Sequence, residues 1–234
     1  MLKHRNITNR INWVLDNLLP PILRDSETLM GILFFPLFGT KTKYFKIFKA
    51  KSPRMSDAQY SSFYRKTASV HLKRETDLSS LSVKTILART KGPTVLDIGS
   101  GRGFLGKELL KAHSELMIVG ADIHVPTELR QSDNPKFIQA NVEALPFKDD
   151  SFDTVICTHT LEHVIHPEIV IREMRRIARK RIIVVVPRQR EYRYTFDLHL
   201  NFFPYEYNLL RLMNQPNGKV QLQQNDWYYE EDQQ

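Results

Sequence analysis

The sequence predicts an α/β fold: a mainly parallel sheet with helices on both faces, closed by an antiparallel hairpin and preceded by a helical extension. Three observations predict it. Short apolar runs alternate with helical segments after residue 90, a glycine-rich turn follows the first run, and a short polar turn separates the last two β-like runs. With 234 residues, 41% hydrophobic and 26% charged, the chain can form one such domain plus an appendage.

The first third of the chain has a helical pattern. Residues 11–19 have helical spacing and end at a pair of prolines, which break a helix. A second helical segment follows, and residues 58–90 are typical of two helices that lead into the first strand. We therefore expect residues 1–90 to form a basic helical extension and residues 91–230 to form the α/β domain.

Five apolar runs in the second part have the length and spacing of strands in a parallel sheet. They are expected at residues 94–98, 117–121, 136–139, 153–158 and 181–186. Helices are expected between them, among others at residues 104–112 and 168–178. Since this alternation implies a parallel sheet, a ligand is expected at the carboxyl ends of the strands.

The part after the fifth strand is short. Residues 205–213 predict a helix, and residues 219–223 together with 227–229 predict the closing antiparallel hairpin. The polar tail at residues 230–234 is expected to be disordered. The only cysteine, Cys157, excludes an intrachain disulfide, and its apolar neighbours predict a small buried side chain.

The turn after the first strand carries the most specific chemistry. Asp97 lies at the end of the strand, and glycines follow at every second position, where a backbone without Cβ lets a ligand approach. Residues 101–106 also satisfy the dinucleotide pattern GxGxxG. A carboxylate at the strand end would repel a pyrophosphate, however. It suits a ligand with a positive group, such as the amino group and sulfonium of S-adenosylmethionine.

Several ordered segments resemble a known family. They are residues 97–103 (DIGSGRG), 118–122 (IVGAD), 141–147 (NVEALPF), 151–156 (SFDTVI) and 161–164 (LEHV). In this order they resemble the class I S-adenosylmethionine-dependent methyltransferases, with a methyltransferase type 11-like domain, over roughly residues 90–190. The resemblance implies a three-layer αβα Rossmann-like methyltransferase fold, an enzyme, and S-adenosylmethionine as its cofactor.

The resemblance also implies which residues bind this cofactor. They are Asp97, Gly99, Gly101 and Gly103 on the methionine side, Asp122 and Ile123 at the ribose, Asn141 and Val142 at the adenine edge, and Thr158 after the fourth strand. The family often has an acid where this chain has Asn141. An amide oxygen can still accept that hydrogen bond, as a neutral and weaker acceptor. No metal is expected.

The net charge of +8 is unevenly distributed along the chain. Residues 1–91 hold 17 Lys and Arg against 6 Asp and Glu, while the remainder holds 17 against 20. Within the basic part, apolar residues 29–38 precede a lysine-rich run at 41–51. Two interpretations stay open. Residues 29–51 contact an anionic membrane surface peripherally, or the apolar run covers the core or the active site as a lid while the lysines face water.

The apolar run at 29–38 does not predict a membrane span. A span needs about 20 apolar residues, and Pro36 is expected to interrupt this run. No secretory signal is evident either, because the run starts late and acidic residues precede it. We therefore expect a cytoplasmic protein, peripheral at the membrane in the first of the two interpretations.

Two histidine-bearing segments follow strand ends, where such a fold binds its substrate. His159 directly follows the fourth strand, and His199 lies two residues after Asp197, which is expected to orient it. If the acceptor is a hydroxyl, either histidine would serve as the base, because the ordinary pKa of histidine is near neutral pH. The residues expected to bind the acceptor are Arg188, Tyr192 and Tyr194, with Arg190 and Arg193 as further partners for a phosphate or carboxylate.

Three function classes remain open. The first is a methyltransferase for a small-molecule, lipid or lipid-linked glycan acceptor, acting by O-methylation with His199 or His159 as the base. The second is an RNA methyltransferase that uses the basic N-terminal region, although the chain shows no recognisable RNA-binding module. The third is a non-catalytic protein that binds S-adenosylmethionine; the intact glycine loop and its two acids count against it.

Overall fold

The computed structural model describes residues 13–14, 18–67, 75–194 and 197–233, and the chain divides into two compact units. The sheet unit consists of Glu75–Arg188 and Tyr205–Gln234. The helical unit consists of Met1–Arg74 and Gln189–Pro204. Residues 189–204, which follow the fifth strand, therefore belong to the same unit as the N-terminal helices, although residues 75–188 separate the two segments in the chain.

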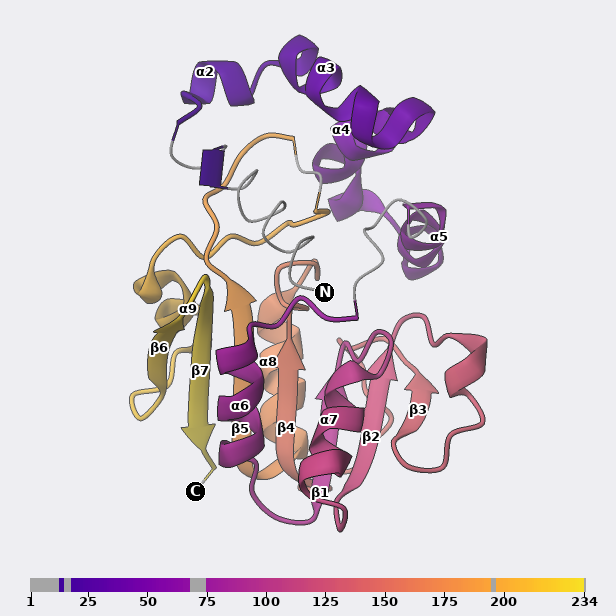
Figure 1. Cartoon of the computed structure of the whole chain (residues 1–234), viewed down its shortest axis with the longest axis vertical. Coiled ribbons are helices and arrows are strands. Elements are labelled where there is room, and N and C mark those ends of the chain that lie inside the picture. The colour runs from indigo at the N-terminus through magenta and orange to yellow at the C-terminus, as the bar shows by residue number, and fades with distance from the viewer. Residues whose placement is uncertain (1–12, 15–17, 68–74, 195–196, 234) are drawn as a thin grey trace. The chain divides into compact units, whose positions relative to one another are not determined.

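The sheet unit contains seven strands in the order β3-β2-β1-β4-β5-β7-β6 (Figure 1). Their bounds are β1 (Thr94–Ile98), β2 (Met117–Asp122), β3 (Lys136–Gln139), β4 (Phe152–Thr158), β5 (Ala178–Pro187), β6 (Lys219–Gln223) and β7 (Asp226–Asp232). The first five strands are parallel, and β7 pairs antiparallel with β5 and β6. Central strands such as β4 are buried almost throughout, which explains their continuous apolar runs.

Helices cover both faces of this sheet (Figure 1). They are α6 (Ser80–Arg89), α7 (Phe104–Ala112), α8 (Pro167–Ile177) and α9 (Glu206–Met213), with a 3-10 turn at Thr127–Leu129. Ile86 of α6 and Leu109 of α7 are fully buried in one cluster with Val95 and Ile156 of the sheet. The amphipathic helix α8 packs its apolar side against β4 and β5. The predicted three-layer αβα fold with a C-terminal antiparallel hairpin is confirmed.

Two parts of the sheet unit differ from the predictions. β5 begins at Ala178, where the sequence predicts the end of a helix. β7 continues to Asp232, so the expectation of a disordered tail is wrong for residues 230–232. Arg175 of α8 gives the physical reason, because its guanidinium donates to both carboxylate oxygens of Glu231 at 2.8 Å. The polar tail residues thus form ion pairs and a strand ladder.

The helical unit is built from short helices. They are α2 (Pro21–Arg24), α3 (Glu27–Phe38), α4 (Thr42–Lys51) and α5 (Asp57–Thr67), with 3-10 turns at Gly39–Lys41 and Ser52–Arg54. The Ser26 hydroxyl caps α3 by accepting a hydrogen bond from the Leu29 N–H. Pro36 lies inside α3 and does not interrupt it, because a proline in the last turn removes little of the hydrogen-bonded helix. Most of the helix predicted at 11–19 lies outside the described residues.

An aromatic cluster forms the core of the helical unit. Its buried members are Met30, Phe34, Phe45, Phe48, Phe63, Tyr192, Tyr194 and Leu198. Phe38 stacks on Phe45 with ring centroids 4.1 Å apart, and Phe48 packs against Phe63 at 5.1 Å. Such pairs add about 0.5–1.5 kcal/mol each beyond the area they bury. One face of the apolar run at 29–38 is therefore part of a core within this unit.

The observed units divide the chain at other places than the predicted boundary at residue 90. Residues 75–90 belong to the sheet unit, because Leu78 and Ile86 are buried in its core. Residues 189–204 belong to the helical unit, because Tyr192 and Leu198 are buried in the aromatic cluster. Within the residues that the structure describes, no helix is long and apolar enough to cross a membrane.

Candidate functional site

The candidate site lies at the carboxyl ends of β1 and β4, where the strand order of the sheet unit reverses. β1 pairs with β2 on one side and with β4 on the other, so the chain leaves these neighbouring strands in opposite directions. In open α/β sheets this arrangement opens a crevice beyond the strand ends, and ligands bind there. The ends of β1, β2 and β4, together with the loops after β1, β2 and β3, carry the cofactor residues that the sequence predicts.

The glycine loop after β1 needs its glycines for two different reasons. Gly99 has a φ of +73°, and a Cβ there would be 1.9 Å from the Thr160 hydroxyl oxygen, so packing forbids a side chain. Gly101 has a φ of +52°, and a Cβ there would meet no atom within 4 Å. Packing inside the protein thus explains Gly99. At Gly101 the open space leaves the backbone accessible to a ligand.

Asp97 at the end of β1 is a buried carboxyl group with an unsatisfied oxygen. Its side chain is 2% exposed, and Oδ1 has no hydrogen-bond partner in the part of the chain that the structure describes. Burial, followed by the charge of Asp122, raises the pKa of Asp97 to about 8. An orphaned buried acceptor is costly, so this arrangement calls for a ligand that donates hydrogen bonds and carries positive charge.

Asp122 at the end of β2 is held by two backbone donors. The N–H of Gly101 donates to Oδ2 at 2.9 Å, and the N–H of His124 donates to Oδ1 at 2.9 Å. Burial raises the pKa of Asp122, and these two hydrogen bonds oppose the rise. A carboxylate has about four acceptor sites, so this fixed group can still accept from a diol. Ile123 follows it in the same loop.

Asn141 lies in the loop after β3. Its Oδ1 accepts a hydrogen bond from the N–H of Glu143 at 2.9 Å, so the loop itself orients the amide. The preceding N–H, of Ala140, donates to the carbonyl of Asp122 at 2.9 Å and ties this loop to the end of β2. Val142 is buried beside it. The role of Asn141 and Val142 at an adenine ring stays a prediction.

His159 follows Thr158, the last residue of β4, and takes a positive φ of 47°. Its Nδ1 is 3.3 Å from Glu162 Oε1, and its Nε2 is 3.5 Å from Asp226 Oδ1. Burial alone would lower the pKa of His159, but Asp226 and then Glu162 outweigh it and raise the pKa to about 10. A ring that stays protonated at neutral pH cannot accept a proton, so this geometry argues against His159 as the base.

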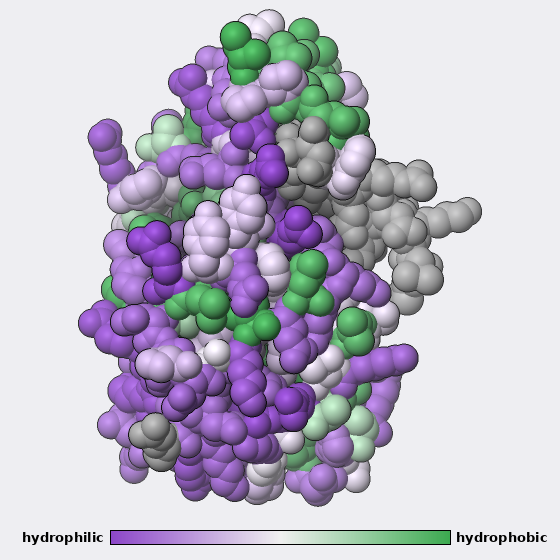
Figure 2. All heavy atoms as spheres, turned by 90° about the vertical axis from the view of Figure 1, so that its left-hand side faces the viewer, coloured by the Kyte–Doolittle hydropathy of each residue, from purple (hydrophilic) through white to green (hydrophobic). Residues whose placement is uncertain are grey.

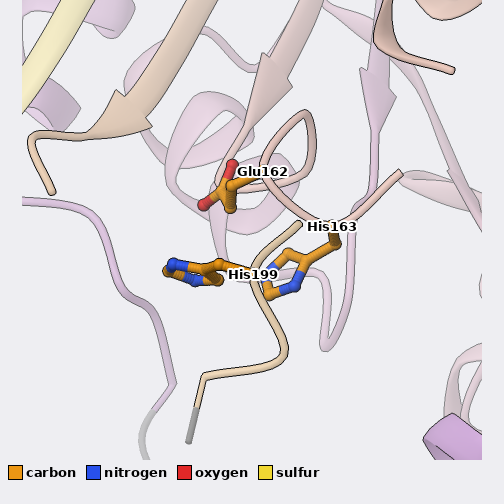
Figure 3. A group of neighbouring side chains, drawn as sticks. All are labelled: Glu162, His163 and His199. Atoms are coloured by element: carbon orange, nitrogen blue, oxygen red, sulfur yellow. The ribbon is translucent and has the colours of Figure 1, made fainter. Parts of the chain in front are cut away.

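Glu162 and His163 lie on the loop after β4 (Figure 3). Glu162 is fully buried and faces the charged His159 ring, which indicates a structural ion pair. Asp226, the first residue of β7, is the second carboxylate that faces the His159 ring. Its Oδ2 also accepts a hydrogen bond from the N–H of Ser79. No sequence pattern predicts this role of Asp226, because nothing in a hairpin turn signals a partner in a distant loop.

His199 belongs to the helical unit, where Gln189 determines its tautomer. Gln189 Nε2 donates to the Asp197 carboxylate at 3.2 Å and to the Tyr192 hydroxyl at 2.6 Å. A carboxylate only accepts, so the amide oxygen of Gln189 faces His199 Nδ1, at 2.5 Å. An amide oxygen also only accepts, so the neutral ring carries its proton on Nδ1 and its lone pair on Nε2. Asp197, predicted to orient His199, thus acts through Gln189, a residue that no sequence pattern singles out.

The three residues predicted to bind the acceptor lie in different surroundings. Arg188 follows β5 in the sheet unit and is exposed, and its N–H donates to the carbonyl of Asn225. Tyr192 and Tyr194 are buried in the aromatic cluster of the helical unit. Tyr194 also lines a cavity of about 610 Å³ within that unit. Their role toward an acceptor stays a prediction.

The residues of the sheet unit fit S-adenosylmethionine as a ligand. The orphaned oxygen of Asp97 suits its positively charged amino group, and Asp122 suits its ribose hydroxyls. The open space at Gly101 lets the ligand lie against the backbone. A pyrophosphate fits this loop less well, because it would meet two carboxyl groups.

Similar proteins also indicate a methyltransferase domain. Residues 96–186 match the model of a family described as a methyltransferase domain. The chain is 37% identical over 102 residues to the ubiquinone/menaquinone biosynthesis C-methyltransferase UbiE of Hahella chejuensis, covering 38% of this chain and 39% of that protein. It is 31% identical over 106 residues to the uncharacterized methyltransferase YcgJ of Bacillus subtilis, covering 43% and 42%. The chain thus spans about two-fifths of the length of these relatives.

A solved structure shows the same fold. The PH0226 protein from Pyrococcus horikoshii OT3 is similar with a TM-score of 0.55 at 18% identity, covering 74% of this chain and 99% of that one. The family match ends at residue 186, before the segment that returns to the helical unit. Residues 1–95 and 187–234 therefore lie outside the family match.

Proposed function

We propose, from the premise that residues 96–186 belong to a class I S-adenosylmethionine-dependent methyltransferase domain, that this protein methylates a small-molecule, lipid or lipid-linked acceptor. One observation carries the proposal: the buried, orphaned carboxyl oxygen of Asp97 beside the open backbone at Gly101. S-adenosylmethionine supplies the methyl group when it is bound. The protein's own residues align the ligand with the acceptor and take up the proton that the acceptor loses.

The proposed reaction is O-methylation with His199 as the base. The tautomer that Gln189 imposes leaves the lone pair of the neutral imidazole on Nε2, the atom that would take the hydroxyl proton. His159 suits this role poorly, because its pKa of about 10 keeps it protonated at neutral pH. The proposal requires the segment after β5 to bring His199 to the acceptor.

The cavity in the helical unit supports an acceptor with an anionic group. Its lining includes four cationic side chains and two carboxylates, namely Lys43, Lys46, Lys49, Arg193, Glu27 and Glu191. Lys46 pairs with Glu27 at 2.8 Å, and Lys49 pairs with Glu191 at 3.1 Å. The remaining excess of positive charge suits a phosphate or carboxylate. The positive charge of the helical unit would also suit RNA, which makes an RNA methyltransferase the second candidate.

Isothermal titration calorimetry with S-adenosylmethionine tests the proposal. The wild type should bind, and Asp97→Ala should lose at least about a hundredfold in affinity, because it removes the charged acceptor from a buried site. Asp133→Asn is the matched control, since Asp133 is an exposed acid in the loop before β3. A wild type that does not bind S-adenosylmethionine would refute the methyltransferase activity. Transfer of radiolabelled methyl to RNA, with none to lipid extracts, would favour the second candidate.

A further inference from the structure

Helix α3 of the helical unit is apolar on both of its faces. Its inner face, with Met30 and Phe34, is buried in the aromatic cluster. Its outer face is also apolar: Ile32 is 65% exposed and Phe35 is 62% exposed. No charged residue occurs between Glu27 and Lys41. A surface helix of a globular protein normally carries polar residues on its outer face, so α3 has an apolar face that packing inside the unit does not use.

The apolar surface extends from α3 to the segment before it. The exposed large hydrophobic residues here, called the apolar patch, are Leu18, Ile22, Leu23, Ile32, Leu33 and Phe35. Ile22 alone is 80% exposed. Figure 2 shows that hydrophobic residues, in green, gather at the top of the view. Single exposed hydrophobic residues are ordinary, whereas a contiguous patch of this kind marks an interaction site.

The charge of the helical unit indicates what binds the patch. The segments of the helical unit hold 16 Lys and Arg against 6 Asp and Glu, a net charge of +10, while those of the sheet unit hold 18 against 20. Helix α4 packs against α3 and carries exposed Lys43 and Lys51. An apolar patch beside an excess of positive charge is complementary to a surface with an apolar interior and anionic headgroups.

We propose that the apolar patch of α2 and α3 inserts into the surface of an anionic lipid bilayer, with the lysines of α4 at the headgroups. Helix α3 has 12 residues and is about 18 Å long, much less than the roughly 30 Å of a bilayer core, so it lies in the interface. An RNA partner would use the charge but leave the apolar residues in water. A second copy of the chain would bury the apolar residues but bring two units of +10 together.

Flotation of the full chain with vesicles tests this proposal. Phosphatidylcholine vesicles with and without phosphatidylserine serve as the two probes. We expect binding mainly to the vesicles with phosphatidylserine, weakening as salt is raised. The double variant Ile32→Gln with Phe35→Gln should bind at least about tenfold more weakly, because it removes two side chains that enter the lipid. Lys51→Gln, at an exposed lysine of α4 outside the cavity lining, should weaken binding to the anionic vesicles about fivefold.

Matched controls separate lipid binding from folding. Leu81→Gln changes an exposed leucine on α6 of the sheet unit and should bind vesicles as the wild type does. Glutamine is a good helix former, and both changed residues of α3 are exposed, so far-UV circular dichroism of the double variant should be unchanged. Equal binding of the double variant and the wild type would overturn the proposal. So would a wild type that dimerises through the patch in light scattering, or one that binds RNA but neither kind of vesicle.

Discussion

The sheet unit and the helical unit differ in almost every physical property. A seven-stranded hydrogen-bonded ladder with buried aliphatic side chains stabilises the sheet unit. Contacts among aromatic rings and side chains from distant segments hold the helical unit together. The charges differ in the same way, −2 in the sheet unit and +10 in the helical unit.

This difference indicates that the two units have different functions. The residues that match the methyltransferase family lie in the sheet unit, as do the carboxyl groups that fit S-adenosylmethionine. His199, the cationic cavity and the apolar patch lie in the helical unit. Under the proposed function, the sheet unit binds the cofactor, and the helical unit supplies the base and selects the acceptor. Variants in the helical unit should therefore leave the affinity for the cofactor intact.

The variant His199→Ala should have the largest effect on turnover. Removal of a general base slows a proton-transfer step about 10²- to 10⁴-fold, so kcat should fall by that factor at saturating S-adenosylmethionine. The dissociation constant for S-adenosylmethionine should stay unchanged, because the residues proposed to bind it lie in the sheet unit. Stopped assays with the identified acceptor, together with calorimetry, measure both. His113→Gln, at the end of α7, is the control and should behave as the wild type. Unchanged kcat in His199→Ala would remove this residue from the mechanism.

Asp122→Asn should show the opposite pattern, with a loss of about 10- to 100-fold in affinity for S-adenosylmethionine. The carboxylate now accepts from two N–H donors, Gly101 and His124, with one oxygen each. An amide has only one oxygen, so its NH₂ group must face one of these donors, and the proposed contact with the ribose loses a charged acceptor. Calorimetry measures the affinity, and turnover at saturating cofactor should be near the wild-type value. A fall in kcat with unchanged affinity would contradict this division.

The affinity for S-adenosylmethionine should rise with pH. The pKa of Asp97 is raised to about 8, so the ligand-free carboxyl is mainly protonated at neutral pH and must lose its proton to pair with a cation. The affinity should therefore increase up to about tenfold per pH unit below about pH 8 and level off above it. Calorimetry over this range measures the slope. A retained slope in Asp97→Asn, which cannot titrate, would show that another group is responsible.

The raised pKa of Asp97 also predicts how the stability of the ligand-free sheet unit depends on pH. The folded pKa of Asp97 lies above the ordinary value of 3.8, so the unfolded chain releases this proton first. Stability should therefore fall as the pH rises from about 4 to about 8. Asp97→Asn should remove that fall and raise the melting temperature near pH 8, although it impairs cofactor binding. A lower melting temperature in this variant at pH 8 would contradict the assignment of a buried charge.

The two units also differ in how far their sequences predict them. In the sheet unit, period and composition placed β1 and α7 at their observed bounds, since buried parallel strands and an amphipathic helix have local signatures. In the helical unit, the sequence predicts that Tyr192 and Tyr194 bind the acceptor. Their side chains are instead buried against residues more than a hundred positions away in the chain. Contacts such as Gln189 with His199, or Asp226 with His159, depend on tertiary folding and leave no periodic signal.

The smallest expected effect comes from Lys49→Met, which should loosen the helical unit alone. Lys49 Nζ donates to the carbonyl of Tyr192 at 2.9 Å and lies 4.3 Å from the centroid of the Phe202 ring, so it joins α4 to the segment after β5. Methionine keeps the apolar stem but loses these two contacts and the partly exposed ion pair with Glu191, a loss of about 1 kcal/mol. Hydrogen–deuterium exchange should become about fivefold faster in peptides from α4. Peptides from β1 and β4 should exchange at wild-type rates, and Lys51→Met, exposed on the same helix, should change neither unit. Faster exchange throughout the sheet would show that the two units unfold together.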